Sequence, residues 1–191
     1  MKSEYVFYFK NGHLRKFKAN NKRGAVLRAN DKQKEPTTIK NANYICKVDF
    51  NDEEIVIELL KDFESKHKSD LIEHAMVILP SGEVYTCSGN ENGVMVDEIF
   101  KDKLEGSYVT HNHPLSESEY TFSSNDMELF VNMKLKKLRG IDEKYTYEFS
   151  TNAFEIDEMP PDWDEETIYH HCNMIRLAKE YGIGYKRWEN E

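Results

Sequence analysis

Two histidines separated by one residue are the positions in this chain most suited to chemistry. His111 and His113 follow a short β-rich stretch, residues 106–110, and Pro114 comes directly after them. Side chains at positions i and i+2 of a β-strand lie on the same face. A strand that ends here would therefore direct both imidazole rings toward one point.

A carboxylate follows at a spacing that could complete a metal site. Asp126 lies just inside a predicted helix, and either Ser123 or Ser124 could be its N-cap. The carboxylate would then sit in the first turn, near the positive end of the helix dipole. Two imidazoles and one carboxylate leave a fourth position for water, which is typical of a catalytic zinc site. Zinc lowers the pKa of such a water to about 7.

The pattern His-x-His-Pro followed by Ser-x-x-Asp resembles the JAB/MPN metalloprotease signature, the JAMM motif, in the form of its bacterial and phage members. The resemblance covers roughly residues 52–155. Nine residues, 114–122, separate the second histidine from the serine, two more than in the family pattern, and the extra residues fall in a loop where insertion is cheap. The resemblance implies a curved mixed β-sheet flanked by helices.

A glutamate upstream is the candidate general base. Glu73 leads an apolar strand, and a Pro-Ser-Gly turn and a second strand follow, which resembles the glutamate-bearing hairpin of the family. A site of two histidines and one aspartate also lacks a proton acceptor, and burial at the end of an apolar row would raise the pKa of Glu73 toward that task. His74 is the competitor on the opposite face. His67, between two lysines, is expected to be exposed and not to be a ligand.

The resemblance implies a zinc-dependent hydrolase that cleaves a peptide or isopeptide bond in a protein or peptide substrate. His111, His113 and Asp126 would hold one Zn²⁺ per chain, and Glu73 would move the proton. Ser123 would donate to the oxyanion, with Ser124 as its substitute if the longer loop shifts the register.

Three alternatives remain open from the sequence. The first is a catalytically silent JAB-like interaction module of a phage or mobile element. The second is a nuclease, because His-Asn-His evokes the HNH name, but the acidic body opposes binding to phosphates. The third is a regulator that binds an acidic partner through residues 1–50, with a purely structural metal.

Charge is distributed unevenly along the chain, whose formal net charge is −9. Residues 1–50 carry 12 Lys and Arg against 4 Asp and Glu, a net +8, and residues 51–191 carry 14 against 31, a net −17. Such asymmetry indicates an accessory segment with its own role. We expect that segment to bind an acidic partner or to offset the acidic body, and we favour both over binding to nucleic acid.

Compartment follows from what the sequence lacks. There is no run of about 18 apolar residues and no signal-peptide pattern at the N-terminus, so we expect a cytoplasmic protein without a membrane span. The three cysteines are far apart and odd in number, which favours reduced thiols over a disulfide framework.

Alternating strand and helix patterns predict an α+β (α/β-like) fold in three parts. Residues 1–50 form a basic β-rich extension with a hairpin over 4–18, a helix over 22–31 and a strand within 39–50. Residues 51–157 form the JAB-like metal-binding domain. Residues 158–191 form a C-terminal helix, 164–181, and a tail. The central part is expected to contain a helix over 52–68, a hairpin over 73–87, a short strand at 94–96, a helix from 124 to 139, and strands at 145–149 and 153–156.

Overall fold

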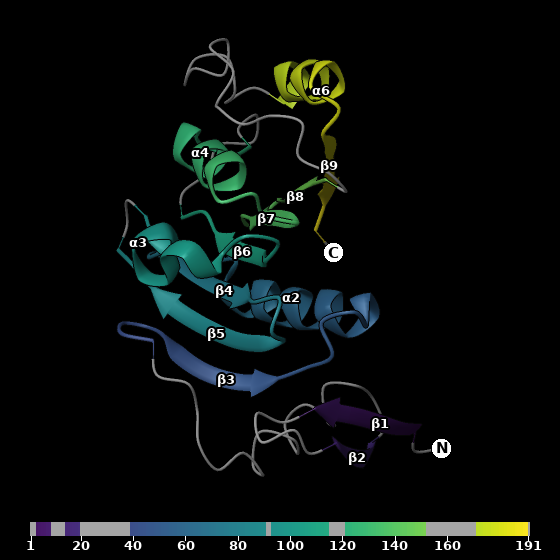
Figure 1. Cartoon of the computed structure of the whole chain (residues 1–191). Helices are drawn as coiled ribbons and strands as arrows, with labels where there is room; N and C mark the ends of the chain where they lie inside the picture. Colours follow the sequence, from purple (N-terminus) through teal and green to yellow (C-terminus); the bar gives the residue numbers. More distant parts are fainter. Residues whose placement is uncertain are drawn as a thin grey trace.

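A mixed β-sheet between helices forms the body of the protein. The computed structural model describes residues 3–8, 14–19, 39–90, 93–114, 121–151 and 171–190. Within these residues one sheet has seven strands in the order β3-β5-β4-β6-β7-β8-β9 (Figure 1). The α+β prediction is therefore confirmed. The strands are β3 (Asn43–Lys47), β4 (His74–Ile78), β5 (Glu83–Ser88), β6 (Tyr108–Asn112), β7 (Lys137–Ile141), β8 (Tyr145–Ser150) and β9 (Gly184–Glu189).

The parallel pairing among the described strands lies at the centre of the sheet. β6 pairs antiparallel with β4 on one side and parallel with β7 on the other, and the remaining neighbours are antiparallel. In the register, His111 lies opposite Ala75 of β4 and Gly140 of β7. The two histidines of the predicted site therefore end a central strand with neighbours on both sides.

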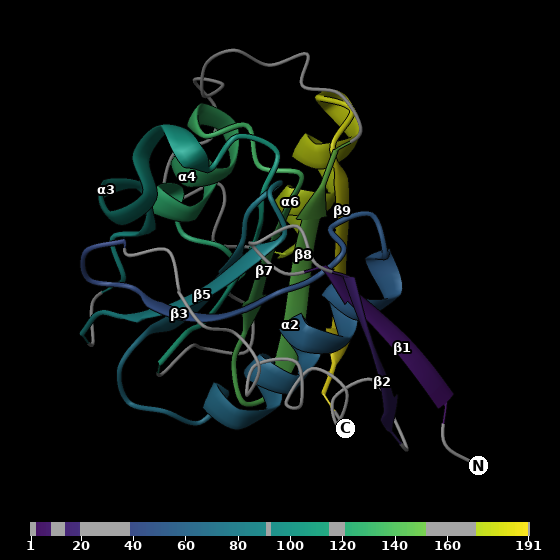
Figure 2. The ribbon, with the colours of Figure 1, turned by 60° about the horizontal axis from the view of Figure 1, so that its bottom comes forward.

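Helix α2 (Glu53–His67) covers one face of the sheet (Figure 2). Asp52 caps it through its side chain, which accepts from the amide of Ile55 at 3.2 Å. An apolar stripe of α2 is buried, and it packs with alternate residues of β4, Met76 and Ile78. The stripe consists of Ile55, Val56, Leu59, Leu60 and Phe63.

Among the described residues, the other face carries the larger core and three helices. They are α3 (Val96–Phe100), followed by the 3-10 turn η1 (Lys101–Lys103), α4 (Ser124–Asn132) and α6 (His171–Glu180). Ala75, Val77 and Leu79, the other alternate residues of β4, belong to this core. Helices α2 and α4 thus lie on opposite sides of the sheet, as both views show (Figures 1 and 2).

A buried ion network joins α2 to the sheet behind the predicted site. The Arg139 guanidinium donates to Glu64 through Nε at 2.6 Å and Nη2 at 2.8 Å, and to Glu148 through Nη1 at 2.8 Å. Thr110, the residue before His111, donates its hydroxyl to Glu64 at 2.7 Å. The buried Arg139 and the two buried glutamates thus have oppositely charged, hydrogen-bonded partners, without which their burial would be costly.

The ends of the chain differ in part from prediction. The hairpin is confirmed, because β1 (Ser3–Tyr8) pairs antiparallel with β2 (Leu14–Ala19) in a separate two-stranded sheet. The predicted tail is wrong in one respect, since β9 pairs with β8 along its whole length. The seven-stranded sheet takes strands from all three predicted parts, and the boundaries between those parts stay predictions.

Two predicted elements in the central part are wrong. The helix expected over 124–139 ends at Asn132, and Lys137–Ile141 is a strand. A turn with Lys134 at a φ of 49° separates the two, and pairing with β6 then holds β7 extended. Val94 to Val96 do not form a strand, because α3 begins at Val96.

Other predictions fall on residues outside those described. They are the helix over 22–31, the strand at 153–156, the first turns of the C-terminal helix, and the loop at 115–120 that holds the two extra residues. Among the described residues, no helix has the length and apolarity needed to cross a membrane.

Candidate metal centre

Successive side chains of strand β6 lie on opposite faces of the sheet, as the i, i+2 argument predicts. His111 belongs to the face covered by α4 and is 3% exposed, and the Asn112 side chain turns to the other face. There Asn112 accepts from the amide of His74 at 2.7 Å and donates to the carbonyl of Ile72 at 2.9 Å. Asn112 therefore fixes the segment that leads into β4, and with it Glu73.

His113 lies one residue beyond β6 and is held by its backbone and by aromatic rings. Its amide donates to the carbonyl of Ile141 at 2.7 Å, which continues the pairing with β7. The ring packs edge-on against Tyr147, with centroids 5.5 Å apart. Gly140 makes room for this packing, since a Cβ there would lie 2.6 Å from the Tyr147 ring and 3.2 Å from Phe122.

Asp126 is positioned by the first turn of α4. Ser123 is the N-cap, and its hydroxyl oxygen accepts from the Asp126 amide at 3.2 Å. The Asp126 carboxylate in turn accepts from the Ser123 amide at 2.8 Å and from the Ser123 hydroxyl at 2.7 Å, both through Oδ2. This reciprocal capping box leaves the carboxylate aimed at the histidines. Of the two predicted caps, Ser123 is the one observed, and Ser124 begins the helix.

Three potential ligand atoms converge between β6 and α4. Nε2 of His111 lies 2.6 Å from Nε2 of His113 and 2.9 Å from Oδ1 of Asp126, and the His113 nitrogen lies 3.5 Å from Oδ2. Donors around a tetrahedral zinc with bonds of 2.0–2.1 Å would be about 3.3 Å apart. The observed separations of 2.6, 2.9 and 3.5 Å lie on both sides of that spacing, and the two histidine nitrogens would have to move apart around an ion, so His111, His113 and Asp126 could hold a metal ion.

The second nitrogen of His111 also suits a metal ligand. A hydrogen bond with the backbone of Arg139 raises the pKa of His111. The ring is therefore the donor and the Arg139 carbonyl the acceptor. Ligand histidines commonly donate their remaining N–H to a carbonyl or carboxylate, which orients the ring and directs the other nitrogen to the metal. Here that other nitrogen is Nε2, the atom that faces His113 and Asp126.

Without a metal, one proton would take the place of the positive charge. Burial opposes charge on His111, but Asp126, together with Glu73, outweighs burial and raises the pKa of His111 to about 9. Burial and the positive charge of His111 lower the pKa of His113 to about 4. Burial opposes ionisation of Asp126, but His111 keeps the pKa of that carboxyl well below its usual range. The three groups together therefore favour one bound positive charge, which is the His111 proton when no metal is bound.

Glu73 lies just before β4 and beside this centre. Its Oε2 accepts from the amide of Val94 at 3.1 Å, and its backbone continues the pairing of β4 with β5 through Gly89 and Asn90. Burial raises the pKa of Glu73, which His111 and the Val94 amide partly offset. A carboxylate whose pKa is raised in this way is a better proton acceptor at neutral pH.

A pocket of about 250 Å³ opens next to Glu73 and Asp126. Ser123 lines it as well, so three of the five predicted site residues face one space. The other two, His111 and His113, lie against Asp126, which forms part of the pocket wall. The remaining walls come from the segment 93–97 and from the exposed side of α4. The Ser123 hydroxyl donates to Asp126 in this structure, so it orients that carboxylate.

A second group of potential ligands was missed by the sequence reasoning. His67, Asp70 and His74 lie close together at the end of α2 and the start of β4. His67 is half-buried and hydrogen-bonded to Asp70, and not exposed as expected. The spacing His-x-x-Asp-x-x-x-His was the available signal, but it crosses a helix end and a loop, so periodicity could not show that the three side chains meet.

Comparison with known proteins returned nothing that could identify the chain: no protein family, curated protein or solved structure matches it.

Proposed function

We propose that this protein is a zinc-dependent peptidase or isopeptidase of the JAB/MPN type. The observation that carries the proposal is the meeting of His111, His113 and Asp126 from two separate elements, with Glu73 on the wall of the adjoining pocket. The two nitrogens and one carboxylate oxygen suit zinc better than magnesium or calcium, which prefer oxygen ligands.

Zinc bound to these three residues would acidify a water and polarise the carbonyl of the scissile bond. Glu73 would accept the proton of that water through its free carboxylate oxygen, since Oε2 is held by the Val94 amide. It would then pass the proton to the leaving amine. The raised pKa of Glu73 serves both steps, because the group must take up and release a proton at neutral pH.

Ser123 would contribute in two ways. In the structure it orients Asp126, and with Asp126 bound to a cation its hydroxyl could turn to donate to the oxyanion that forms in the pocket. Ser124 is the substitute donor in the first turn of α4. The JAB/MPN assignment is further supported by a central strand that carries the histidines, a helix that carries the aspartate, and a hairpin that follows the glutamate.

The test combines metal content with cleavage of a defined peptide library that includes lysine-isopeptide-linked members. We expect His113→Ala to contain one zinc equivalent fewer per chain than the wild type, measured by elemental analysis. Glu73→Gln should keep the wild-type zinc content and lose about 10²–10⁴-fold in turnover, which is the usual contribution of a general base. His171→Ala is the matched control, because it also removes a histidine. His171 lies on α6 against Tyr185 of β9 and belongs to neither group of potential metal ligands.

Two outcomes would count against the proposal. Equal zinc content in wild type and His113→Ala would show that these residues do not bind the metal. Zinc at the site with no cleavage of any library member would favour a catalytically silent interaction module.

A further inference from the structure

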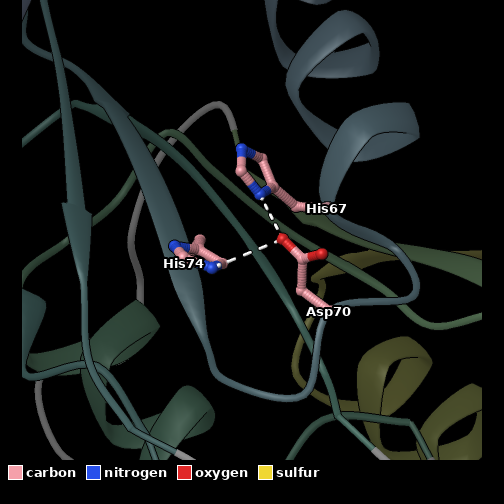
Figure 3. Close-up of side chains that lie close together, drawn as sticks. All are labelled: His67, Asp70 and His74. Carbon is pink, nitrogen blue, oxygen red and sulfur yellow. Dashed lines mark hydrogen bonds and ion pairs between the residues drawn. The ribbon is translucent and has the colours of Figure 1, made fainter.

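A second cluster of metal-binding side chains lies on the opposite face of the sheet from the first. Nδ1 of His67 lies 2.6 Å from Oδ2 of Asp70, and Nε2 of His74 lies 3.4 Å from the same oxygen. Figure 3 shows each histidine turning a ring nitrogen toward the Asp70 carboxylate. The three ligand atoms all lie within 4.8 Å of one another.

The two clusters are separated by the alternation of the strands. His74 shares the α2 face with Met76 and Ile78, and Glu73 precedes it on the opposite face. The His74 ring contacts the His67 ring, with centroids 4.5 Å apart, and His67 in turn contacts Phe63 of α2, at 4.4 Å. A metal held by these histidines would therefore be distinct from one held by His111 and His113.

We propose that His67, Asp70 and His74 form a second site for a divalent transition-metal ion of the zinc class. Two imidazole nitrogens and a carboxylate oxygen are the donor set that such ions prefer. The separation of 3.4 Å between His74 and Asp70 is close to the distance of about 3.3 Å between donors on a tetrahedral zinc. The side chain of Asp70 is 41% exposed, so a fourth position is open to water.

The second nitrogen of His74 supports this assignment. Nδ1 lies 2.8 Å from the hydroxyl of Ser88 on the neighbouring strand β5. When Ser88 accepts from Nδ1, the lone pair of Nε2 in the neutral ring faces the Asp70 oxygen, and either a metal ion or a second ring proton would satisfy both atoms. A hydrogen-bonded partner on the remote nitrogen is the usual means of orienting a ligand histidine.

A metal ion at this second site would help to position Glu73 beside the centre formed by His111, His113 and Asp126. The ion would join the last residue of α2 to the first residue of β4 and so close the turn 68–73. Asn112 holds the same turn from the central strand, through the His74 amide and the Ile72 carbonyl. Glu73 lies at the end of the turn, directly before a ligand of one site and beside the ligands of the other.

The experiment is a zinc titration of the full chain after removal of metals with a chelator. We expect two equivalents of Zn²⁺ for the wild type and one for His67→Ala/His74→Ala. The His111→Ala/His113→Ala variant should also bind one equivalent. At a zinc concentration about a hundred times the dissociation constant, its Tm should rise by roughly 5–10 °C.

Further variants make the assignment specific. Adding Asp70→Asn to His111→Ala/His113→Ala should weaken the remaining zinc binding and reduce the rise in Tm, while adding His171→Ala should leave both unchanged. If the variant lacking His111 and His113 does not fold, the loss of one equivalent in His67→Ala/His74→Ala still decides the question.

Each result bears on the proposal in a defined way. A wild type that binds two equivalents, with His67→Ala/His74→Ala losing one, supports it. Equal stoichiometry in the wild type and His67→Ala/His74→Ala overturns it, and the cluster is then a hydrogen-bonded array only. Failure of the first site is separate, since it would appear as unchanged stoichiometry in His111→Ala/His113→Ala.

Discussion

Replacing Ser123 with alanine tests whether the capping box of α4 also builds the metal centre. The change removes the oxygen that accepts from the Asp126 amide at 3.2 Å and the hydroxyl that donates to the Asp126 carboxylate at 2.7 Å. The bond from the Ser123 amide to Oδ2, at 2.8 Å, would remain. Asp126 would therefore stay in the first turn but lose one of the two hydrogen bonds that it accepts from Ser123.

The expected size follows from those two bonds. Loss of a serine N-cap costs about 1 kcal/mol. A hydrogen bond to a charged group contributes about 1.5 kcal/mol or more. The metal-free Ser123→Ala protein should therefore be less stable to urea by roughly 2–3 kcal/mol. Removing a group that orients a ligand typically weakens metal affinity by about 10–100-fold, which we expect for zinc.

The assays are urea denaturation in a chelator and zinc titration against a competing chromophoric chelator. Ser123→Thr should restore most of both losses, because threonine also caps helices. Ser124→Ala, one residue further along, should change stability by no more than about 0.5 kcal/mol. A destabilised Ser123→Ala protein with wild-type zinc affinity would refute the reasoning that the cap orients the ligand. Wild-type stability and affinity together would refute the capping geometry itself.

Three more perturbations test the surroundings of the site. In a chelator, the stability of the wild type should fall by about 3 kcal/mol as pH rises from 6.5 to 9. The reason is that the folded pKa of His111 is about 9, so its contribution is complete below its unfolded pKa and is lost as pH rises through 9. Asp126→Asn should abolish most of this dependence, and a wild-type stability independent of pH would contradict the pairing. Asn112→Ala should cost about 2 kcal/mol in urea denaturation, because it leaves a partly buried amide and a partly buried carbonyl without their partner. Arg139→Met should cost about 3–5 kcal/mol, because the buried Glu64 loses its cation, while Glu148 is left with Lys137 at 3.1 Å. Arg176→Met, which breaks an exposed pair on α6, should cost no more than about 1 kcal/mol, and equal costs for the two arginines would refute the burial argument.

Predictions that depended on local spacing agree with the structure. The distance of two residues between the histidines decides that both lie on one side of a strand end, whatever that strand pairs with. The cap of α4 and the carboxylate in its first turn are also local, since they depend on contacts three residues apart. The apolar stripe of α2 follows the helical period for the same reason.

Contacts between distant segments determined what the sequence could not predict. The apolar residues after α4 continue a helix-like pattern through Leu138, but pairing of Lys137–Ile141 with β6, about thirty residues earlier, makes that segment a strand. The last residues became β9 because β8 offers them an edge to pair with.

The sequence by itself identified the side chains that we propose for the chemistry and how each is turned on its own element. Only the tertiary structure decided that Glu73 meets Asp126 across a pocket, and that His67, Asp70 and His74 meet behind them. The physical reason is that periodicity describes one element at a time, whereas a site depends on how strands and helices pack against one another.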